Sequence, residues 1–216
     1  MNNQANILNK ENGAIFLVWL FHISAIIGIA LGHFEWFVSK TPLNLIVISL
    51  VMFVAYPVTN KASLGIAWLF YLTGMSVEWV GVHYDILFGS YAYGENLGPK
   101  VDGVPWVIGL NWVILTFVTA AISTRLFKNI WIRIFIGATM MVFLDFFIEQ
   151  TAPILDFWEF SGGYAPIQNY LAWLAISAFL HYLYQRSLLL GSFTVSIHIY
   201  LAQLIFFIFL YGYLSV

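Results

Sequence analysis

Seven long apolar segments dominate this sequence, and few folds can accommodate them. A helix needs about 20 apolar residues to cross the hydrocarbon core of a bilayer. Within lipid, a helix satisfies its own backbone hydrogen bonds. We therefore expect an all-α integral membrane protein, a seven-helix transmembrane bundle. The segments lie at 14–32, 42–58, 63–82, 105–124, 130–149, 166–185 and 193–214.

The composition supports the same class. The 216 residues are 62% hydrophobic and only 8% charged, too few charges to cover a soluble domain. The net charge of −2 gives no nucleic-acid footprint, and the absence of cysteine excludes disulfides and thiolate chemistry. The polar residues 1–13 precede an apolar run without a small-residue cleavage site, so we expect a retained first span. The chain 1–216 reads as a single polytopic membrane domain.

The basic residues predict the orientation, because cytoplasmic loops are enriched in Lys and Arg. Only Lys40 and Lys100 fall on the side opposite the N-terminus. This predicts a cytoplasmic N-terminus, an outer C-terminus and a multi-pass protein of the cell membrane, the inner membrane in a bacterium. The six basic residues on the N-terminal side are Lys10, Lys61, Arg125, Lys128, Arg133 and Arg186.

Acidic residues show the opposite distribution. Of the ten, only Glu11 lies on the predicted cytoplasmic side. The two long connections, 83–104 and 150–165, are both predicted on the outer side, and long loops on a compact scaffold are usually functional. Each leads into a helix with a Pro and, seven residues later, a Trp. The sequence therefore concentrates its polar chemistry at the outer face.

Three carboxylates near the outer ends of the predicted helices are the candidate catalytic residues: Glu78, Asp145 and Glu149. The spacing of Asp145 and Glu149 places both on one helix face. Two poorly solvated like charges repel each other, so we expect one of them to hold its proton. A neutral acid beside an ionised one is suited to proton transfer. The alternative for Glu78 is that it reaches the interface or pairs with Lys100.

Aromatic and polar residues of the same region are candidates for substrate binding. Aromatic residues form 19% of the chain. They either make an interfacial belt or line a cleft that holds a long apolar ligand and stabilises a cation. His83 and Asp85 form a candidate shuttle or are simply solvated, and Asn111 and Asn169 either cap helices or position a water. The full candidate set is Trp79, His83, Asp85, Tyr91, Tyr93, Trp106, Asn111, Trp158, Tyr164, Asn169 and Trp173.

Three polar motifs, in order, carry a resemblance: EWVGVHYDILFGSYAYGENLGPKVDGVPWVIGLNW, LDFFIEQTAPILDFWEF and GYAPIQNYLAW. Over about residues 63–185 the chain resembles the membrane carotenoid-biosynthesis family that contains the bacterioruberin- and myxol-type carotenoid hydratases. The resemblance implies addition of water across the terminal C1=C2 bond of an acyclic carotenoid end. It implies a membrane-dissolved carotenoid, water and the lipid bilayer as partners, and makes contact with other carotenoid-pathway enzymes possible.

The chemistry of such a hydration suits the candidate residues. Protonation at C2 gives a tertiary cation at C1, which water attacks. The reaction needs a protonated carboxyl, a second group that activates water, and electron-rich walls. We expect Asp145 or Glu149 to be the acid and its neighbour a base or electrostatic stabiliser, with Glu78 completing the site. No cofactor is required.

Other functions remain open or are excluded. A carotenoid cyclase uses the same protonation, but an internal double bond then captures the cation. A proton-coupled transporter also places carboxylates in membrane helices, although usually near the midplane and beside broken helices. The five histidines show no spacing typical of a metal site. All five lysines lie in predicted termini or loops, so no retinal Schiff base is available.

Overall fold

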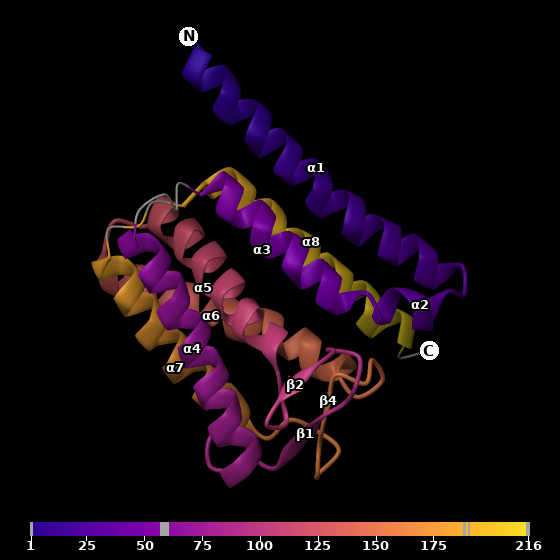
Figure 1. The fold of residues 1–216 in the computed structure, drawn as a ribbon. Helices are drawn as coiled ribbons and strands as arrows, with labels where there is room; N and C mark the ends of the chain where they lie inside the picture. Colours follow the sequence, from indigo (N-terminus) through magenta and orange to yellow (C-terminus); the bar gives the residue numbers. More distant parts are fainter. Residues whose placement is uncertain (1, 57–60, 188, 190, 215–216) are drawn as a thin grey trace.

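The computed structural model of the protein describes residues 2–56, 61–187, 189 and 191–214, with side chains from residue 10 onward. Its architecture is a helical bundle with small β elements at one end (Figure 1). The helices of the described residues are α1 (Asn2–Ala30), α2 (Phe34–Val38), α3 (Thr41–Ala55), α4 (Lys61–Tyr84), α5 (Trp106–Leu126), α6 (Ile130–Thr151), α7 (Ile167–Arg186) and α8 (Phe193–Leu214). The strands are β1 (Tyr91–Tyr93), β2 (Lys100–Val101), β3 (Val104–Pro105) and β4 (Trp158–Phe160).

Each of the seven apolar segments forms a helix, and α2 is an addition between the first two. The first helix begins at Asn2 and includes the polar residues expected to precede it. Residues 57–58, the predicted end of the second segment, lie outside the described residues. Pro42 is in the first turn of α3, while Pro105 and Pro166 are the N-cap residues of α5 and α7. Proline fits these places because no intrahelical partner for its missing N–H is required there.

Five helices of the described chain are long and apolar enough to cross a membrane: residues 10–30 of α1, then α4, α5, α6 and α8. Helix α3 has 15 residues, or about 22 Å of rise, which is shorter than the hydrocarbon core. Helix α7 carries Gln168, Asn169, His181 and Gln185, which lower its hydropathy. The fold is that of an all-α multi-pass membrane protein, while seven crossings and the orientation stay predictions.

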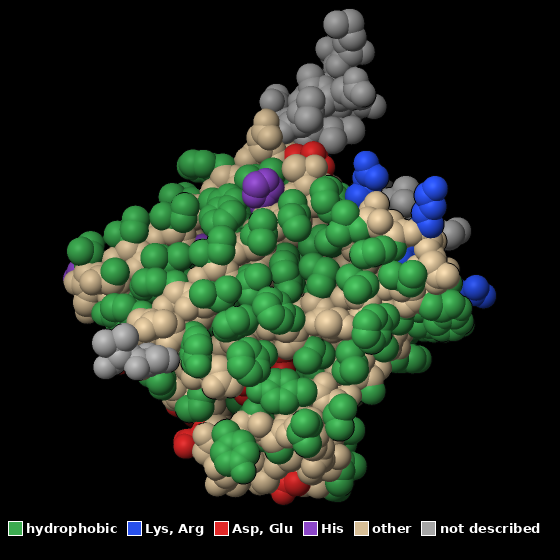
Figure 2. All heavy atoms as spheres, turned by 180° about the vertical axis from the view of Figure 1, so that it is seen from behind, with side chains coloured by type: hydrophobic (Ala, Val, Ile, Leu, Met, Phe, Trp, Pro, Cys, Tyr) green, Lys and Arg blue, Asp and Glu red, His purple; other side chains and the backbone are tan. Residues whose placement is uncertain are grey.

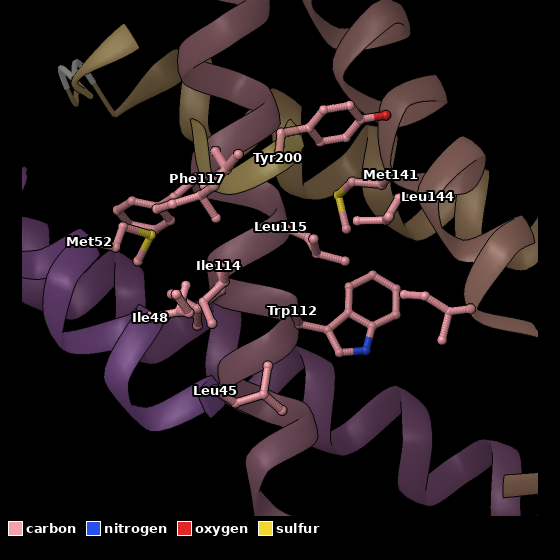
Figure 3. Packing of buried hydrophobic residues seen from close by; sticks show 14 of the residues in the cluster. Leu45, Ile48, Met52, Trp112, Ile114, Leu115, Phe117, Met141, Leu144 and Tyr200 are labelled. Atoms are coloured by element: carbon pink, nitrogen blue, oxygen red, sulfur yellow. The ribbon is translucent and has the colours of Figure 1, made fainter. Parts of the chain in front are cut away.

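Helix α5 is the centre of the bundle. It contacts α3, α4, α6, α7 and α8, and its side chains are buried on nearly every face. A helix that is apolar all round belongs in such a core. Figure 3 shows Ile114, Leu115 and Phe117 of α5 meeting side chains of α3, α6 and α8. Helix α1 lies on the outside, against α3 and α8 (Figure 1).

The surface separates apolar and charged side chains. Figure 2 shows one face of the molecule, and hydrophobic side chains cover its middle. The Lys and Arg side chains gather toward the end at which α1 begins, and most Asp and Glu toward the end that carries the β elements. Exposed apolar side chains such as Phe16 (65% exposed) and Phe135 (61%) suit contact with lipid.

The two long connections are joined by a small sheet, which the sequence did not predict. Strand β1 of the first connection pairs antiparallel with β4 of the second, in the register Tyr91 with Phe160 and Tyr93 with Trp158. Strands β2 and β3 form a hairpin whose turn residues, Asp102 and Gly103, have positive φ angles of 48° and 84°. Two-residue hairpin turns with positive φ at both positions favour the sequence Asp-Gly.

Asp156 joins the same two connections at a second place. One of its carboxylate oxygens accepts a hydrogen bond from the backbone N–H of Glu95 at 2.9 Å, and its carbonyl oxygen accepts one from the N–H of Asn96 at 3.2 Å. A Cβ atom at Gly94 would lie 2.1 Å from this carboxylate, so glycine is required there. Asp156 therefore holds the loops together at the end of the bundle that carries the candidate site.

Candidate active site

Glu78 lies in the last two turns of α4, buried in the bundle. Its Oε2 atom accepts hydrogen bonds from the hydroxyls of Tyr91 and Tyr93, at 2.7 Å each. Its Oε1 atom accepts one from the indole N–H of Trp112 at 2.9 Å. Lys100, the alternative partner, instead donates to the backbone carbonyl oxygen of Tyr93 at 2.9 Å. Groups from β1 and α5 therefore fix Glu78 in place.

Two glycines of α4 make room for these donors. A Cβ atom at Gly74 would lie 2.7 Å from the side chain of Trp112, and one at Gly81 would lie 2.8 Å from the hydroxyl of Tyr91. Real Cβ contacts are essentially never shorter than 3.0 Å. Gly74 and Gly81 stand four residues before and three after Glu78, on its own helix face. They let both donors approach the carboxylate.

The two tyrosines are positioned by the β1–β4 pairing. Residues i and i+2 of a strand point to the same face, so Tyr91 and Tyr93 reach Glu78 together. Burial, and secondly the charge of Glu78, raise the pKa of both tyrosines well above its usual value. Both hydroxyls therefore keep their protons and remain available as donors.

Asp145 and Glu149 project from the last two turns of α6, where they are 1% and 8% exposed. The side-chain N–H₂ of Asn169, on α7, donates to Glu149 Oε1 at 2.9 Å and approaches Asp145 Oδ2 at 3.3 Å. The indole N–H of Trp158, on β4, donates to Glu149 Oε2 at 2.8 Å. One amide thus bridges the carboxyls, as expected for two side chains on one helix face.

All three carboxyls border one small cavity of about 20 Å³, which we call the carboxylate cavity. A space of this size holds about one water molecule. Its lining combines carboxyl, amide and hydroxyl groups with aromatic rings. The lining residues are Glu78, Phe88, Tyr91, Tyr93, Ile108, Asn111, Asp145, Ile148, Glu149, Trp158, Phe160, Asn169 and Trp173.

A larger cavity of about 360 Å³, which we call the apolar cavity, adjoins the first. It lies among α1, α2, α3, α5, α6, α8 and the two long connections, and its lining is mostly apolar. Asn44 Oδ1 and Gln203 Oε1, in its wall, have no hydrogen-bond partner among the described residues. The residues that line both cavities are Ile108, Asn111, Ile148 and Trp158.

Aromatic rings form much of the carboxylate cavity. Trp173, in its lining, stacks on Trp112, which lies outside the lining, with ring centroids 4.1 Å apart and planes 14° apart. These are the tryptophans that follow Pro105 and Pro166 by seven residues. Tyr93 meets Trp158 edge to face at 5.9 Å. Electron-rich ring faces can stabilise a positive charge that develops in the cavity.

Of the eleven substrate-binding candidates, six line the carboxylate cavity and five do not. His83 pairs with Asp102 at 3.4 Å and not with Asp85, which is exposed and has a φ of 57°. Trp79 donates to the same Asp102 at 2.7 Å, beneath the β2–β3 turn. The five that lie elsewhere are Trp79, His83, Asp85, Trp106 and Tyr164, of which Tyr164 is 75% exposed.

Sequence reasoning left out some residues of the site. Trp112 holds Glu78, and Phe88, Ile108, Ile148 and Phe160 complete the lining of the carboxylate cavity. The glycines on either side of Glu78 were an available signal for Trp112, since small residues mark close helix contacts. Within the described chain, no group of three or more His, Asp or Glu side chains is placed to hold a metal ion.

The fold and the site define a helical multi-pass membrane protein with a buried cluster of carboxyl groups beside an apolar cavity. Residues 40–216 match the family described as "Carotenoid biosynthesis protein". The match covers well over half of the chain, and the protein belongs to this family. Searches of curated proteins and of solved structures find no significant match. The family establishes a role in carotenoid biosynthesis and leaves the reaction to be argued from the site.

Proposed function

We propose that the protein is a carotenoid 1,2-hydratase, which adds water across the terminal C1=C2 double bond of an acyclic carotenoid end. One observation carries the proposal: three buried carboxyls border a water-sized cavity that adjoins a larger, mostly apolar one. An apolar end group and one water are the two reactants of a hydration. The family supports the carotenoid as the apolar reactant.

The substrate reaches the site from the membrane. Trp36 and Leu43, in the wall of the apolar cavity, are 59% and 50% exposed at the surface of the bundle. A membrane-dissolved polyene enters there and lies along the apolar cavity, with its end passing between Ile108, Ile148 and Trp158. The rest of the molecule stays in the bilayer.

The reaction begins with transfer of a proton from a carboxyl of the cluster to C2. The π electrons of the double bond form the new C–H bond and leave a tertiary cation at C1. Ionised carboxylates and the aromatic faces of Trp158 and Trp173 stabilise this cation. Water then forms the C–O bond and gives a proton to a carboxylate, so the product is a tertiary alcohol. These residues supply the acid, base and cation stabilisation without a cofactor.

The test is product analysis in bacterial cells that make lycopene. Cells that also make this protein should accumulate a carotenoid heavier by one water, and its hydroxyl should carry heavy oxygen when the culture water does. Glu159→Gln should give the same product as the wild-type protein, because Glu159 is an exposed carboxylate in β4, away from the carboxylate cavity. A cyclic product of unchanged mass would instead establish a cyclase. Unaltered lycopene beside well-expressed, folded protein would refute both reactions.

A further inference from the structure

The three carboxyls differ in the hydrogen-bond donors that surround them. At Glu78, Oε2 faces the hydroxyls of Tyr91 and Tyr93, and Oε1 faces the indole N–H of Trp112. An indole N–H can only donate, and the two phenols keep their protons. Donors on both oxygens stabilise a carboxyl in its ionised form. The surroundings of Glu78 therefore suit a carboxylate.

Glu149 has a comparable environment. Its Oε2 accepts from the indole N–H of Trp158 at 2.8 Å, and its Oε1 accepts from the amide N–H of Asn169 at 2.9 Å. Both donors are N–H groups that cannot accept a hydrogen bond in return. Each of these hydrogen bonds is stronger when the carboxyl of Glu149 is ionised. Glu149 is thus also held as an acceptor.

Asp145 differs from the other two. Its Oδ1 atom is buried without a partner among the described residues. Its Oδ2 atom has only the Asn169 amide, at 3.3 Å, and this amide lies closer to Glu149. An ionised carboxylate that is 1% exposed and so poorly bonded is costly, whereas a protonated one carries no charge. The neighbouring charge of Glu149 acts in the same direction.

We propose that Asp145 is the acid of the site, holding its proton on Oδ1 toward the carboxylate cavity, and that Glu78 and Glu149 stay ionised. The protonation states follow from the donors, while the acceptor of the proton, an alkene carbon, rests on the proposed function. The two fixed negative charges border the cavity in which the cation forms. They stabilise the cation more than the neutral alkene, as catalysis requires.

Asp145 and Glu149, both on α6, together give and take up all the protons that the reaction needs. The O–H bond of Asp145 breaks and its proton forms the C–H bond at C2. Water adds to C1, and its surplus proton goes to Glu149. That proton then returns to Asp145, one helical turn away, through the water that refills the cavity. Alkene and water are consumed, the alcohol is formed, and both carboxyls regain their starting states.

The first experiment detects the proton directly and does not depend on any activity. A protonated carboxyl gives a C=O band in the infrared spectrum that a carboxylate lacks. We expect this band in the purified wild-type protein at neutral pH in a detergent without carbonyl groups, and also in Glu78→Gln and in the control Glu159→Gln. It should be lost in Asp145→Asn. A wild-type spectrum without the band, or a band that persists in Asp145→Asn, would overturn the assignment.

Asn at position 145 has the shape and neutrality of a protonated Asp, so Asp145→Asn should unfold close to the wild-type temperature. If it nevertheless fails to fold, Asp145→Glu provides the same test. That variant keeps a carboxyl whose band shifts in frequency when it belongs to position 145. An unshifted band would place the proton on another residue.

The second experiment measures product in lycopene-making cells. Asp145→Asn should lose at least about 100-fold in rate, the contribution typical of a general acid, whereas Glu159→Gln should retain full activity. The two proposals fail in different ways. Hydration by the wild-type protein and undiminished hydration by Asp145→Asn would end the assignment of the acid and leave the hydratase intact. A protonated Asp145 in a protein that hydrates nothing would end the proposed function alone.

Discussion

The contact of Gly74 with Trp112 allows a quantitative prediction about how α4 and α5 build the site. In Gly74→Ala the new Cβ would lie 2.7 Å from the Trp112 side chain, whereas ordinary contacts begin at 3.4 Å. The indole must therefore move by about 0.7 Å. Its ring already stacks on Trp173 at a centroid distance of 4.1 Å. A shift of this size takes the 2.9 Å hydrogen bond to Glu78 beyond the normal range of 2.7–3.2 Å.

The expected loss of stability has two parts. Overpacking costs about 1–3 kcal/mol, and a lost hydrogen bond to a charged group costs about 1.5–3 kcal/mol. The better helix propensity of Ala returns about 1 kcal/mol. A net loss of about 1.5–5 kcal/mol lowers the unfolding temperature of a chain of this size by roughly 3–20 °C. Activity should fall as well, because Glu78 loses a donor.

Gly65→Ala is the matched control. Gly65 lies on the same helix and is exposed, and a Cβ atom there would meet nothing within 4 Å. This variant should unfold at the wild-type temperature or slightly above it. The assay is thermal unfolding of both proteins in the same lipid nanodiscs, followed by tryptophan fluorescence. Equal unfolding temperatures for Gly74→Ala and Gly65→Ala would show that the contact between α4 and Trp112 is not tight.

Three further substitutions probe other parts of the site. Trp158→Phe removes the donor to Glu149 Oε2 but keeps an aromatic wall. It should slow product formation about 10- to 100-fold, because a hydrogen bond to a charged group contributes about 1.5–3 kcal/mol. An unchanged rate would contradict this role of Trp158. Tyr93 has a higher pKa in the folded protein than in the unfolded chain. Its contribution to stability is therefore complete below about pH 10 and declines by up to about 1.4 kcal/mol per pH unit above it. Unfolding temperatures measured on both sides of that pH should fall less steeply for Tyr93→Phe. Gln203→Leu removes a buried amide oxygen that has no partner among the described residues, and should raise the free energy of unfolding by about 1 kcal/mol.

The helices follow from the sequence because their causes are local. Long apolar runs predict them, and Pro42, Pro105 and Pro166 mark where α3, α5 and α7 begin. The start of α1 differs from the prediction: the polar residues 2–13 predict a helix that begins at residue 14, whereas α1 begins at Asn2. Polarity reports the environment of a residue more directly than its backbone conformation. Asn, Gln, Lys and Glu are acceptable in a helix that continues beyond the apolar run.

The two long connections contain one feature that a local sequence pattern predicts and one that it does not. Asp102-Gly103 between two valines is a strong hairpin signal, and the β2–β3 turn could have been predicted from it. The pairing of β1 with β4 joins segments far apart in the chain, and no short-range sequence pattern predicts it. This pairing brings Tyr93 next to Trp158 and so links the donors of Glu78 to those of Glu149.

The candidate site could be predicted in part for the same reason. Helical spacing alone places Asp145 and Glu149 together. That Glu78 joins them depends on how α4 packs against α5, which the sequence indicates only through Gly74 and Gly81. His83 was selected by residue type and position, but its orientation is set by Asp102, across the β2–β3 turn. Residue type predicts which side chains can act, and tertiary packing decides which of them meet.

The sizes of the two cavities bear on the choice between hydration and ring closure, since both reactions pass through the same cation. Ring closure requires the polyene to fold back so that a second double bond reaches C1. The carboxylate cavity, at about 20 Å³, has room for about one water and none for a folded-back chain. The remaining chain can lie extended in the apolar cavity, beyond Ile108, Asn111, Ile148 and Trp158. In the proposed reaction, an extended chain keeps its internal double bonds away from the cation, so a water beside Glu149 and Asn169 would be the nearest nucleophile.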